Sequence, residues 1–341
     1  MKSTNAFISD QVKGHDDQPS SLPANESVSI VVATLDRPDD LRECLWRLRL
    51  QDVRRPTEII VVDNHPASGL TPPVMSEFPG MKLVTECRQG LAYARNRGFL
   101  ASQGEIVVAT DDDVIAPPDW LEKLLAPFVG PEVMVVTGNI LPWKLETSAQ
   151  RLFEAYGGLG RGLKRWVADG KWFRQYRTAP PTWSLGATAN AAFRATIFRH
   201  PQIELMDEAL GPGMPSGVGE DTYLFYKVLK AGYAIVYEPA ACVRHKHRHD
   251  LHALRRQIFG YSKGHVAYHL TTLFRDGDWR ALINLAALLP AHHLRRTLRR
   301  IVGRSSYPLS MIPVEIAGNL VGPWALCKSR LRVRREGKSS I

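Results

Sequence analysis

Short apolar runs alternate with amphipathic stretches along the first 140 residues of the chain. The apolar runs lie at residues 28–33, 58–62, 81–85, 105–110 and 133–137. They are rich in β-branched residues, which is typical of strands buried on both faces. Amphipathic stretches at residues 38–48, 90–101 and 119–128 predict helices between them. Strand and helix in turn, with short links, predict a three-layer α/β/α fold around a mostly parallel sheet.

The alternation of strand and helix breaks between residues 140 and 215, where Gly, Pro and aromatic residues are frequent. Beyond this section we expect a helix at residues 221–230, a strand at residues 234–237 that ends before Pro239, and a long helix at residues 251–274. The 341 residues therefore provide one large α/β domain with a helical extension.

The positive charge of the chain is concentrated at one end. Residues 291–341 hold eleven Lys or Arg against two acidic residues, so they carry nine of the ten formal net charges. A nearly neutral body does not favour a nucleic-acid partner, because such partners need a basic folded face. The four cysteines lie far apart without CxxC spacing, so neither a zinc site nor a disulfide framework is indicated.

Two predicted strands end in carboxylates. Asp63 follows the strand at residues 58–62, and Asp111, Asp112 and Asp113 follow the strand at residues 105–110. Ligands of open α/β sheets bind beyond the carboxyl ends of the strands. Three adjacent carboxylates favour Mg²⁺ or Mn²⁺ held together with substrate phosphates. The alternatives are an acidic turn that caps the next helix and, for Asp63, an Asx turn.

Two further segments carry candidate chemistry. Three glycines between residues 213 and 219 precede Glu220 and Asp221 at a predicted helix start, which suits Asp221 to act as a general base or as a simple N-cap. A run of histidines follows at residues 245–252, and we expect His245 or His247 to be a metal ligand. The others fit a basic surface loop.

These segments together resemble family 2 of the glycosyltransferases, which have the GT-A fold. The resemblance runs over residues 28–250 and rests on VSIVVATLDRP from Val28, IIVVDN from Ile59, GLAYARNRG from Gly90, DDD at residues 111–113 followed by PDWL, GATANAAFR from Gly186, and GED at residues 219–221. The Gln-x-x-Arg-Trp motif of processive members does not occur in the sequence. The resemblance therefore implies the addition of a single sugar.

The resemblance also implies roles for individual residues. In its terms a metal site joins Asp111, Asp113 and His245, and the general base is Asp221. The donor, a nucleotide-diphospho-sugar, contacts Thr34, Asp63, Arg95, Asp111 and Asp112. The acceptor side includes Gly186, Asn190 and Glu220. The implied reaction is a metal-dependent displacement that inverts the anomeric carbon, with a glycan or a lipid-linked molecule as acceptor.

On this interpretation residues 1–27 form a disordered leader, residues 28–140 the nucleotide-sugar half and residues 141–250 the acceptor half. Residues 251–341 form a helical, apolar and basic extension that associates with an anionic membrane surface. The alternative for its end is an amphipathic helix packed on the catalytic domain with a solvated basic tail. We therefore expect a cytoplasmic enzyme, peripheral on the inner face of the cell membrane, in cell-surface glycan or glycolipid synthesis. The alternative is a noncatalytic, membrane-associated protein that binds nucleotide sugars or polyanions. A Rossmann dehydrogenase is disfavoured, because no Gly-x-Gly-x-x-Gly follows the first strand.

Overall fold

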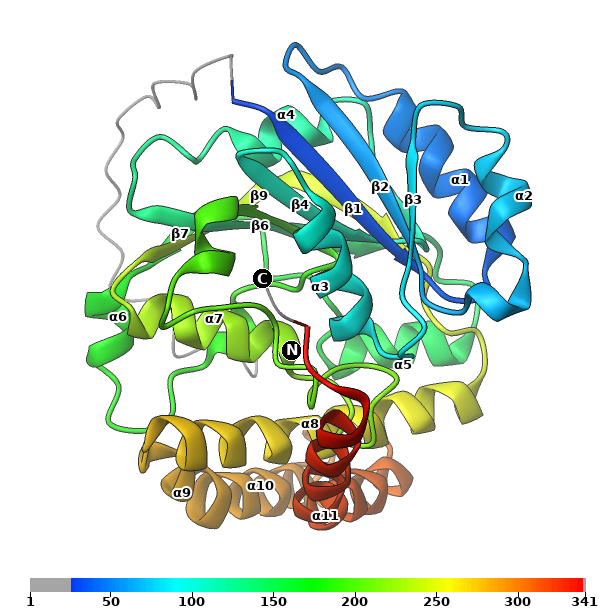
Figure 1. Cartoon of the computed structure of the whole chain (residues 1–341). Helices are drawn as coiled ribbons and strands as arrows, with labels where there is room; N and C mark the ends of the chain where they lie inside the picture. The colour runs from blue at the N-terminus through cyan, green and yellow to red at the C-terminus, as the bar shows by residue number, and fades with distance from the viewer. Residues whose placement is uncertain (1–25, 340–341) are drawn as a thin grey trace.

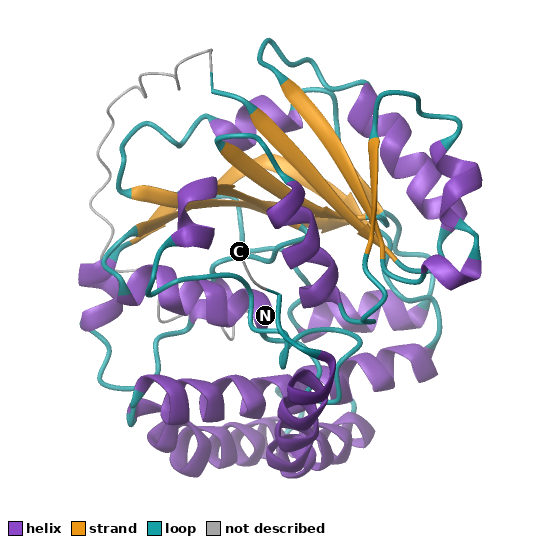
Figure 2. Cartoon of the chain, viewed as in Figure 1, coloured by secondary structure: helices purple, strands orange, loops and turns teal. Residues whose placement is uncertain are grey.

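A computed structural model describes residues 26–339 and folds them around one nine-stranded sheet with helices on both sides (Figures 1 and 2). The leader expected at residues 1–27 lies, apart from its last two residues, outside the described residues. The strand order is β3-β2-β1-β4-β8-β6-β9-β5, and β7 pairs with β9. The strands are β1 (Val28–Thr34), β2 (Thr57–Asp63), β3 (Lys82–Thr85), β4 (Ile106–Asp111), β5 (Val114–Ile115), β6 (Val133–Pro142), β7 (Trp166–Ala168), β8 (Asn190–Arg194) and β9 (Ala234–His245).

The first four strands in this order have the expected parallel arrangement. β1 pairs in parallel with β2 and β4, and β2 pairs in parallel with β3, so all four strands end at one edge of the sheet. Along β1, Ile30 and Val32 belong to one buried cluster, whereas Val31 and Ala33 belong to another. Because side chains alternate along a strand, both faces are covered, which explains the unbroken apolar runs in the sequence.

The remaining strands make the sheet mixed. β8 lies between β4 and β6 and is antiparallel to both, while β6 and β9 are parallel to each other. β5 and β7 are antiparallel to β9. Because β8 is antiparallel to both β4 and β6, β6 runs in the same direction as β4. β9 is parallel to β6, so it ends at the same edge of the sheet as β4.

The expectation that the last long strand ends before Pro239 is wrong. β9 continues to His245, and its register against β6 shifts at Gly138 and Asn139. Proline has no N–H to donate to the sheet, and the irregular pairing leaves Pro239 outside the regular ladder. This continuation brings His245 to the carboxyl edge of the sheet.

The helices form the two outer layers of the domain (Figure 2). One buried cluster joins the sheet to α1 and α4, and the other joins its opposite face to α3, α7 and part of α8. The helices are α1 (Pro38–Arg49), α2 (Thr71–Met75), α3 (Leu91–Ala101), α4 (Trp120–Leu125), α5 (Ser148–Tyr156), α6 (Gly170–Arg174), α7 (Glu220–Lys230), α8 (Leu251–Asp276), α9 (Arg280–Ile283), α10 (Leu289–Ile301) and α11 (Ile312–Glu336).

The C-terminal helices form a further layer at the base of the molecule in Figure 1. α11 packs on α8 at two glycines, because a Cβ at Gly318 or Gly322 would lie 2.7 Å from side-chain atoms of α8. Among the described residues, one helical segment, Leu309–Glu336, is long and apolar enough to cross a membrane by length and composition alone. Its inner face is buried against α8, so this layer is part of the folded body of the protein.

Candidate active site

Three of the predicted metal ligands meet at the carboxyl edge of the sheet. Asp111 is the last residue of β4, Asp113 lies in the turn before β5, and His245 ends β9 opposite Val114 of β5. The potential ligand atoms of Asp111, Asp113 and His245 all lie within 4.8 Å of one another. One aspartate oxygen, Oδ1 of Asp113, is buried 3.2 Å from His245 Nε2 and accepts no hydrogen bond from any residue in the described range. Two carboxylates and an imidazole with an unpartnered buried oxygen form a donor set that fits a divalent cation.

The second candidate histidine supports the first. Nδ1 of His247 lies 3.2 Å from Nδ1 of His245, and its Nε2 lies 2.8 Å from Oε1 of Glu154 in α5. Glu154 thus holds His247, and His247 in turn holds the ring of His245 in one orientation. The structure therefore places His245 in the acidic cluster and His247 behind it.

Asp112 does not belong to this group of potential ligands, and its carboxylate contacts Thr34 of β1 and Arg37. Its Oδ2 accepts a 2.8 Å hydrogen bond from the Thr34 hydroxyl, and Arg37 Nη1 lies 3.1 Å from Oδ1. The same Arg37 nitrogen lies 2.8 Å from Oδ2 of Asp113. Burial raises the pKa of Asp112 to about 7 against the opposing charge of Arg37. The sequence analysis gave Arg37 no role. Its position shortly after a buried strand that ends at the acidic edge of the sheet could have indicated a partner for the aspartates.

Arg95 of α3 connects the acidic turn to the start of α7. Its guanidinium is buried and lies 2.5 Å from Asp111 Oδ1 and 3.2 Å from Glu220 Oε1, and it also donates to the Thr188 hydroxyl. The sequence placed Arg95 among the donor-binding residues. Its burial and its two carboxylate partners indicate that it orients Asp111, which shares the potential metal site with Asp113 and His245.

The two acids at the start of α7 differ in exposure. Glu220 is buried, and burial together with the neighbouring charge of Asp221 raises its pKa to about 7. Asp221 is partly exposed, and its Oδ1 accepts hydrogen bonds from the backbone N–H and the hydroxyl of Thr222 at 2.6 and 3.2 Å. Of the two, Asp221 is the carboxylate that is partly open to solvent, whereas Glu220 pairs with Arg95.

Asp63 and Asn64 end β2 at the same edge. Asp63 is buried; its Oδ1 accepts the backbone N–H of His65, and its Oδ2 has no hydrogen-bond partner within residues 26–339. A free buried carboxylate oxygen at this edge fits the predicted contact with a donor. Asn64, which sequence reasoning quoted without a role, accepts from Gly90 N–H and donates to two backbone carbonyls, so it fixes the start of α3.

Two residues predicted for the acceptor side are internal. Asn190 is fully buried in β8; its Oδ1 accepts from Trp120 Nε1, and its Nδ2 donates to the carbonyls of Asn139 and Ala241. Gly186 has a φ of +124°, and a Cβ there would lie 2.6 Å from the Thr137 side chain. These contacts give Asn190 a role in the sheet and Gly186 a role in a tight turn.

Comparison of the sequence with known proteins finds a matching family model and several relatives. The family model described as Glycosyl transferase family 2 matches residues 29–200. A pre-mycofactocin glycosyltransferase of Mycobacterium tuberculosis (strain ATCC 25618 / H37Rv) is 28% identical over 260 residues, which are 73% of this chain and 49% of that protein. The succinoglycan biosynthesis protein ExoM of Rhizobium meliloti is 27% identical over 222 residues, which are 63% of this chain and 65% of that protein.

A solved structure is similar over most of the chain. It is a mannosyltransferase from Pyrobaculum calidifontis in complex with GDP-Man and Mn²⁺, with a TM-score of 0.59 and 18% identity over 92% of this chain and 91% of that one. This likeness confirms the GT-A fold. The chain spans about half the length of the mycobacterial relatives. Since the family model covers half of the chain, this protein belongs to family 2 of the glycosyl transferases.

Proposed function

We propose that the protein transfers a single sugar from a nucleotide-diphospho-sugar to an acceptor hydroxyl, with inversion at the anomeric carbon. The observation that carries this proposal is the convergence of Asp111, Asp113 and His245 at the sheet edge, joined through Arg95 to the helix that presents Asp221. A cation site and a base on one rigid framework are what such a displacement needs.

The residues that would hold the cation are Asp111, Asp113 and His245. A bound Mg²⁺ or Mn²⁺ would neutralise the charge that develops on the departing diphosphate. The similar mannosyltransferase structure contains Mn²⁺ and GDP-Man, which supports a divalent cation and a nucleotide sugar for this chain too. Asp63, with its free buried oxygen, and Thr34 would lie on the nucleoside side of the donor.

Asp221 would take the proton from the acceptor hydroxyl. The acceptor oxygen then forms a bond to the anomeric carbon, the bond between that carbon and the phosphate oxygen breaks, and the nucleoside diphosphate departs with the electron pair. Asp221 is partly exposed and has no cation within ion-pair distance among the described residues. Glu220 is engaged by Arg95, so it would position the site and not exchange protons with the acceptor.

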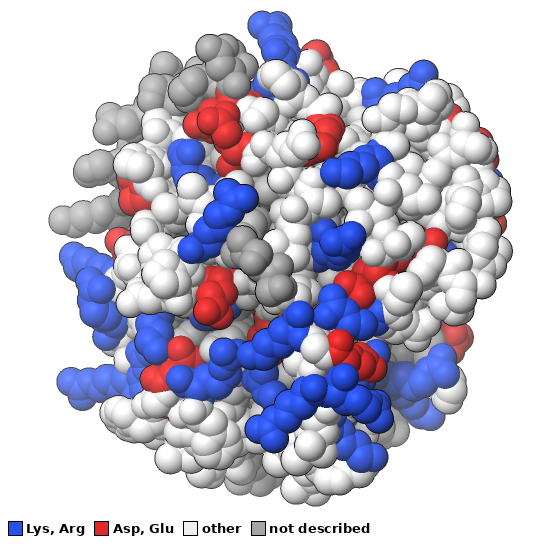
Figure 3. Space-filling model, in the orientation of Figure 1, with Lys and Arg blue, Asp and Glu red and all other residues white. Residues whose placement is uncertain are grey.

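The C-terminal layer supports a peripheral place on a cytoplasmic membrane surface. The outward side of α11 carries large exposed apolar residues, with Ile316 39%, Leu320 78% and Trp324 60% exposed. On α10 and just after it, Leu294, Leu298, Ile301 and Val302 are also exposed. Figure 3 shows Lys and Arg gathered over the region of α11. Helices with exposed apolar sides and nearby cations suit an anionic bilayer surface and a glycan or lipid-linked acceptor.

The reaction is tested by a screen of donor hydrolysis and transfer with GDP-mannose, UDP-glucose and UDP-N-acetylglucosamine, each with Mg²⁺ or Mn²⁺. For the donor that reacts, we expect Asp221→Asn to lower kcat by about 10²- to 10⁴-fold while donor affinity stays unchanged. Asp52→Asn, an exposed aspartate, is the matched control. If Asp221→Asn retains near-normal transfer at saturating donor, Asp221 is not the base.

The alternative, a noncatalytic nucleotide-sugar or polyanion-binding protein, predicts nucleotide binding that is indifferent to the metal and no turnover with any donor. A Mn²⁺ requirement for donor binding in calorimetry would contradict it.

Membrane association is tested by flotation with phosphatidylglycerol-containing vesicles. We expect Leu320→Gln combined with Trp324→Gln to weaken binding, and Trp46→Gln on α1 to leave it unchanged. Equal binding of all three proteins would refute the membrane proposal.

A further inference from the structure

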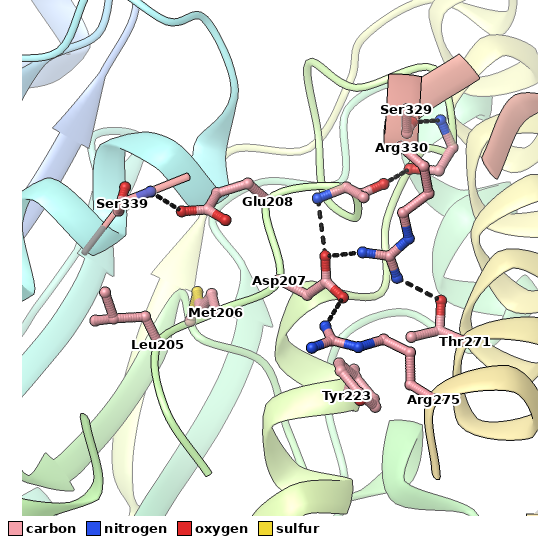
Figure 4. Close-up of polar contacts among 12 residues, drawn as sticks. Leu205, Met206, Asp207, Glu208, Tyr223, Thr271, Arg275, Ser329, Arg330 and Ser339 are labelled. Atoms are coloured by element: carbon pink, nitrogen blue, oxygen red, sulfur yellow. Dashed lines mark hydrogen bonds and ion pairs between the residues drawn. The ribbon is translucent and has the colours of Figure 1, made fainter. Parts of the chain in front are cut away.

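The last turns of α11 and the residues after it cross a loop of the catalytic domain. We call residues 205–219 the acceptor loop and residues 329–339 the C-terminal strap. Figure 4 shows Asp207 and Glu208 of the acceptor loop facing Arg330 and Ser339 of the strap. In Figure 1 the chain leaves α11 and runs toward α3. The two segments are more than one hundred residues apart in sequence and touch along their length.

An ion cluster around Asp207 forms the first attachment. The buried carboxylate of Asp207 lies 2.6 Å from Arg330 Nη1 and 2.8 Å from Arg275 Nη1 of α8. Its Oδ1 also accepts the backbone N–H of Ala209 at 3.0 Å, and Arg330 donates to the Thr271 hydroxyl at 3.2 Å. Two guanidinium groups and a backbone N–H fix the position of this buried carboxylate. The loss of one guanidinium would leave part of its buried charge uncompensated, which is costly.

Hydrogen bonds along the strap form the second attachment. Ser216 N–H donates to the Ser329 hydroxyl at 2.9 Å, and Arg332 Nη1 donates to the Gly213 carbonyl at 3.0 Å. Farther along, Ser339 N–H donates to Glu208 Oε1 at 2.9 Å. Apolar contact accompanies these bonds, since a small buried cluster joins Val333 of the strap to Ala209 and Met214 of the loop and Tyr93 of α3.

The strap also reaches the start of α3, the helix of Arg95. Arg332 Nη2 donates to the carbonyl of Gln89 at 2.5 Å, and the Gly337 carbonyl accepts from Arg88 and from the Tyr93 hydroxyl. The strap therefore holds two segments together: the start of the helix that orients Asp111, and the loop that ends at Glu220 and Asp221.

The acceptor loop has little structure of its own. It contains no helix or strand and makes a single isolated bridge between Gly211 and Gly217. On its other side it packs closely on α8, where a Cβ at Gly264 would lie 2.2 Å from the Val218 carbonyl. Segments of this kind take their conformation from their neighbours. Here the neighbours are α8, the strap and α3, whose Asn96 exchanges hydrogen bonds with Met206 and donates to Glu208.

We propose that the C-terminal strap is a positioning element for catalysis, which acts through Arg330 and Asp207 to hold the acceptor loop and thereby Asp221. The inference rests on the proposed function, in which Asp221 is the base. It gives the basic C-terminal end a second role that is distinct from membrane binding. Arg330 and Arg332 contact the acceptor loop, α8 and the start of α3, whereas Leu320 and Trp324 are exposed.

The test compares Arg330→Met with Arg334→Met, an exposed arginine one turn farther along α11. With the reactive donor from the screen and saturating Mn²⁺, we expect Arg330→Met to lower kcat by about 10- to 100-fold, because a shift of about 1 Å in a catalytic group has this effect. Binding of the corresponding nucleoside diphosphate with Mn²⁺, measured by calorimetry, should stay unchanged. Hydrogen exchange should rise within residues 205–219. Arg330→Lys should restore part of the rate, and Arg334→Met should behave as wild type.

A second pair of variants guards against a general loss of folding. Ser329→Ala removes a single hydrogen bond to the loop, and we expect a smaller fall in kcat with an unchanged melting temperature. Combining Asp207→Asn with Arg330→Met should cost little more than either change alone, because both act on one contact.

Wild-type kcat and unchanged loop exchange in both Arg330→Met and Ser329→Ala would refute the strap proposal, even if Asp221→Asn is inactive. Full activity of Asp221→Asn would instead refute the proposed base. In that case hydrogen exchange within residues 205–219 would still test whether the strap holds the loop.

Discussion

Replacing Asn190 by Leu tests whether this residue belongs to the sheet or to the acceptor site. Leu has a similar volume and no polar atoms, so the change removes the amide and keeps the packing. Three hydrogen bonds disappear: one from Trp120 Nε1 at 2.8 Å, and two to the carbonyls of Asn139 and Ala241 at 2.9 and 2.8 Å. All three lie where β8 meets β6, β9 and α4.

The magnitude follows from burial. Asn190 and Trp120 are both fully buried, so water cannot replace the lost partner of the indole N–H. A buried donor or acceptor without a partner costs about 1 to 3 kcal/mol. Carbonyl oxygens tolerate the loss of a partner better than N–H groups, so the three losses together cost about 3 to 6 kcal/mol. For a protein of this size that corresponds to a melting temperature lower by about 4 to 8 °C.

The assay is thermal unfolding followed by circular dichroism, with Gln202→Leu, an exposed amide, as the control. Below the melting temperature the KM for the acceptor should equal that of the wild type. A melting temperature within about 2 °C of the wild type would refute this reasoning. A raised acceptor KM without loss of stability would refute it too and would show that Asn190 serves the acceptor.

Three further results are expected. His245→Gln should weaken Mn²⁺ binding in calorimetry by about 10- to 100-fold, and unchanged affinity would remove His245 from the cation site. Burial alone would raise the pKa of Asp207, but Arg330 and Arg275 outweigh it and hold this pKa below its ordinary value. The Asp207 carboxylate therefore stabilises the fold above its unfolded pKa of about 4 and loses this effect as pH falls further, so the melting temperatures of wild type and Asp207→Asn should differ at pH 7 and converge below about pH 4. Gly264→Val should lower stability by about 1 to 3 kcal/mol and raise hydrogen exchange in the acceptor loop, and a wild-type exchange pattern would show that Gly264 is not a tight contact.

Much of the parallel half of the sheet could be predicted, because its strands are covered on both faces. A strand that is apolar on both sides has few alternatives, and the observed β1, β2 and β4 lie within one or two residues of the expected runs. The error at Pro239 came from treating proline as the end of a strand. Local sequence does not show that a bulge against β6 absorbs it.

The sequence alone indicated which carboxylates gather at one place, because carboxylates at the ends of buried strands must share one edge of a parallel sheet. It also indicated that Asp221 starts a helix after a glycine-rich loop. The choice of Asp221 over Glu220 as the base came from the family resemblance, and the structure adds a physical difference: Glu220 is buried and contacts Arg95, whereas Asp221 is partly exposed.

The tertiary structure alone decided the roles that depend on contacts across the chain. Arg37 and Arg95 became visible as partners of the acidic turn only when β1 and α3 were placed beside it. The basic C-terminal end, which by composition predicts only attraction to anionic surfaces, places Arg330 against a buried carboxylate of the acceptor loop. The physical reason is that periodicity and charge are local properties of the chain, whereas the pairing of two buried groups depends on the distance between segments that folding brings together.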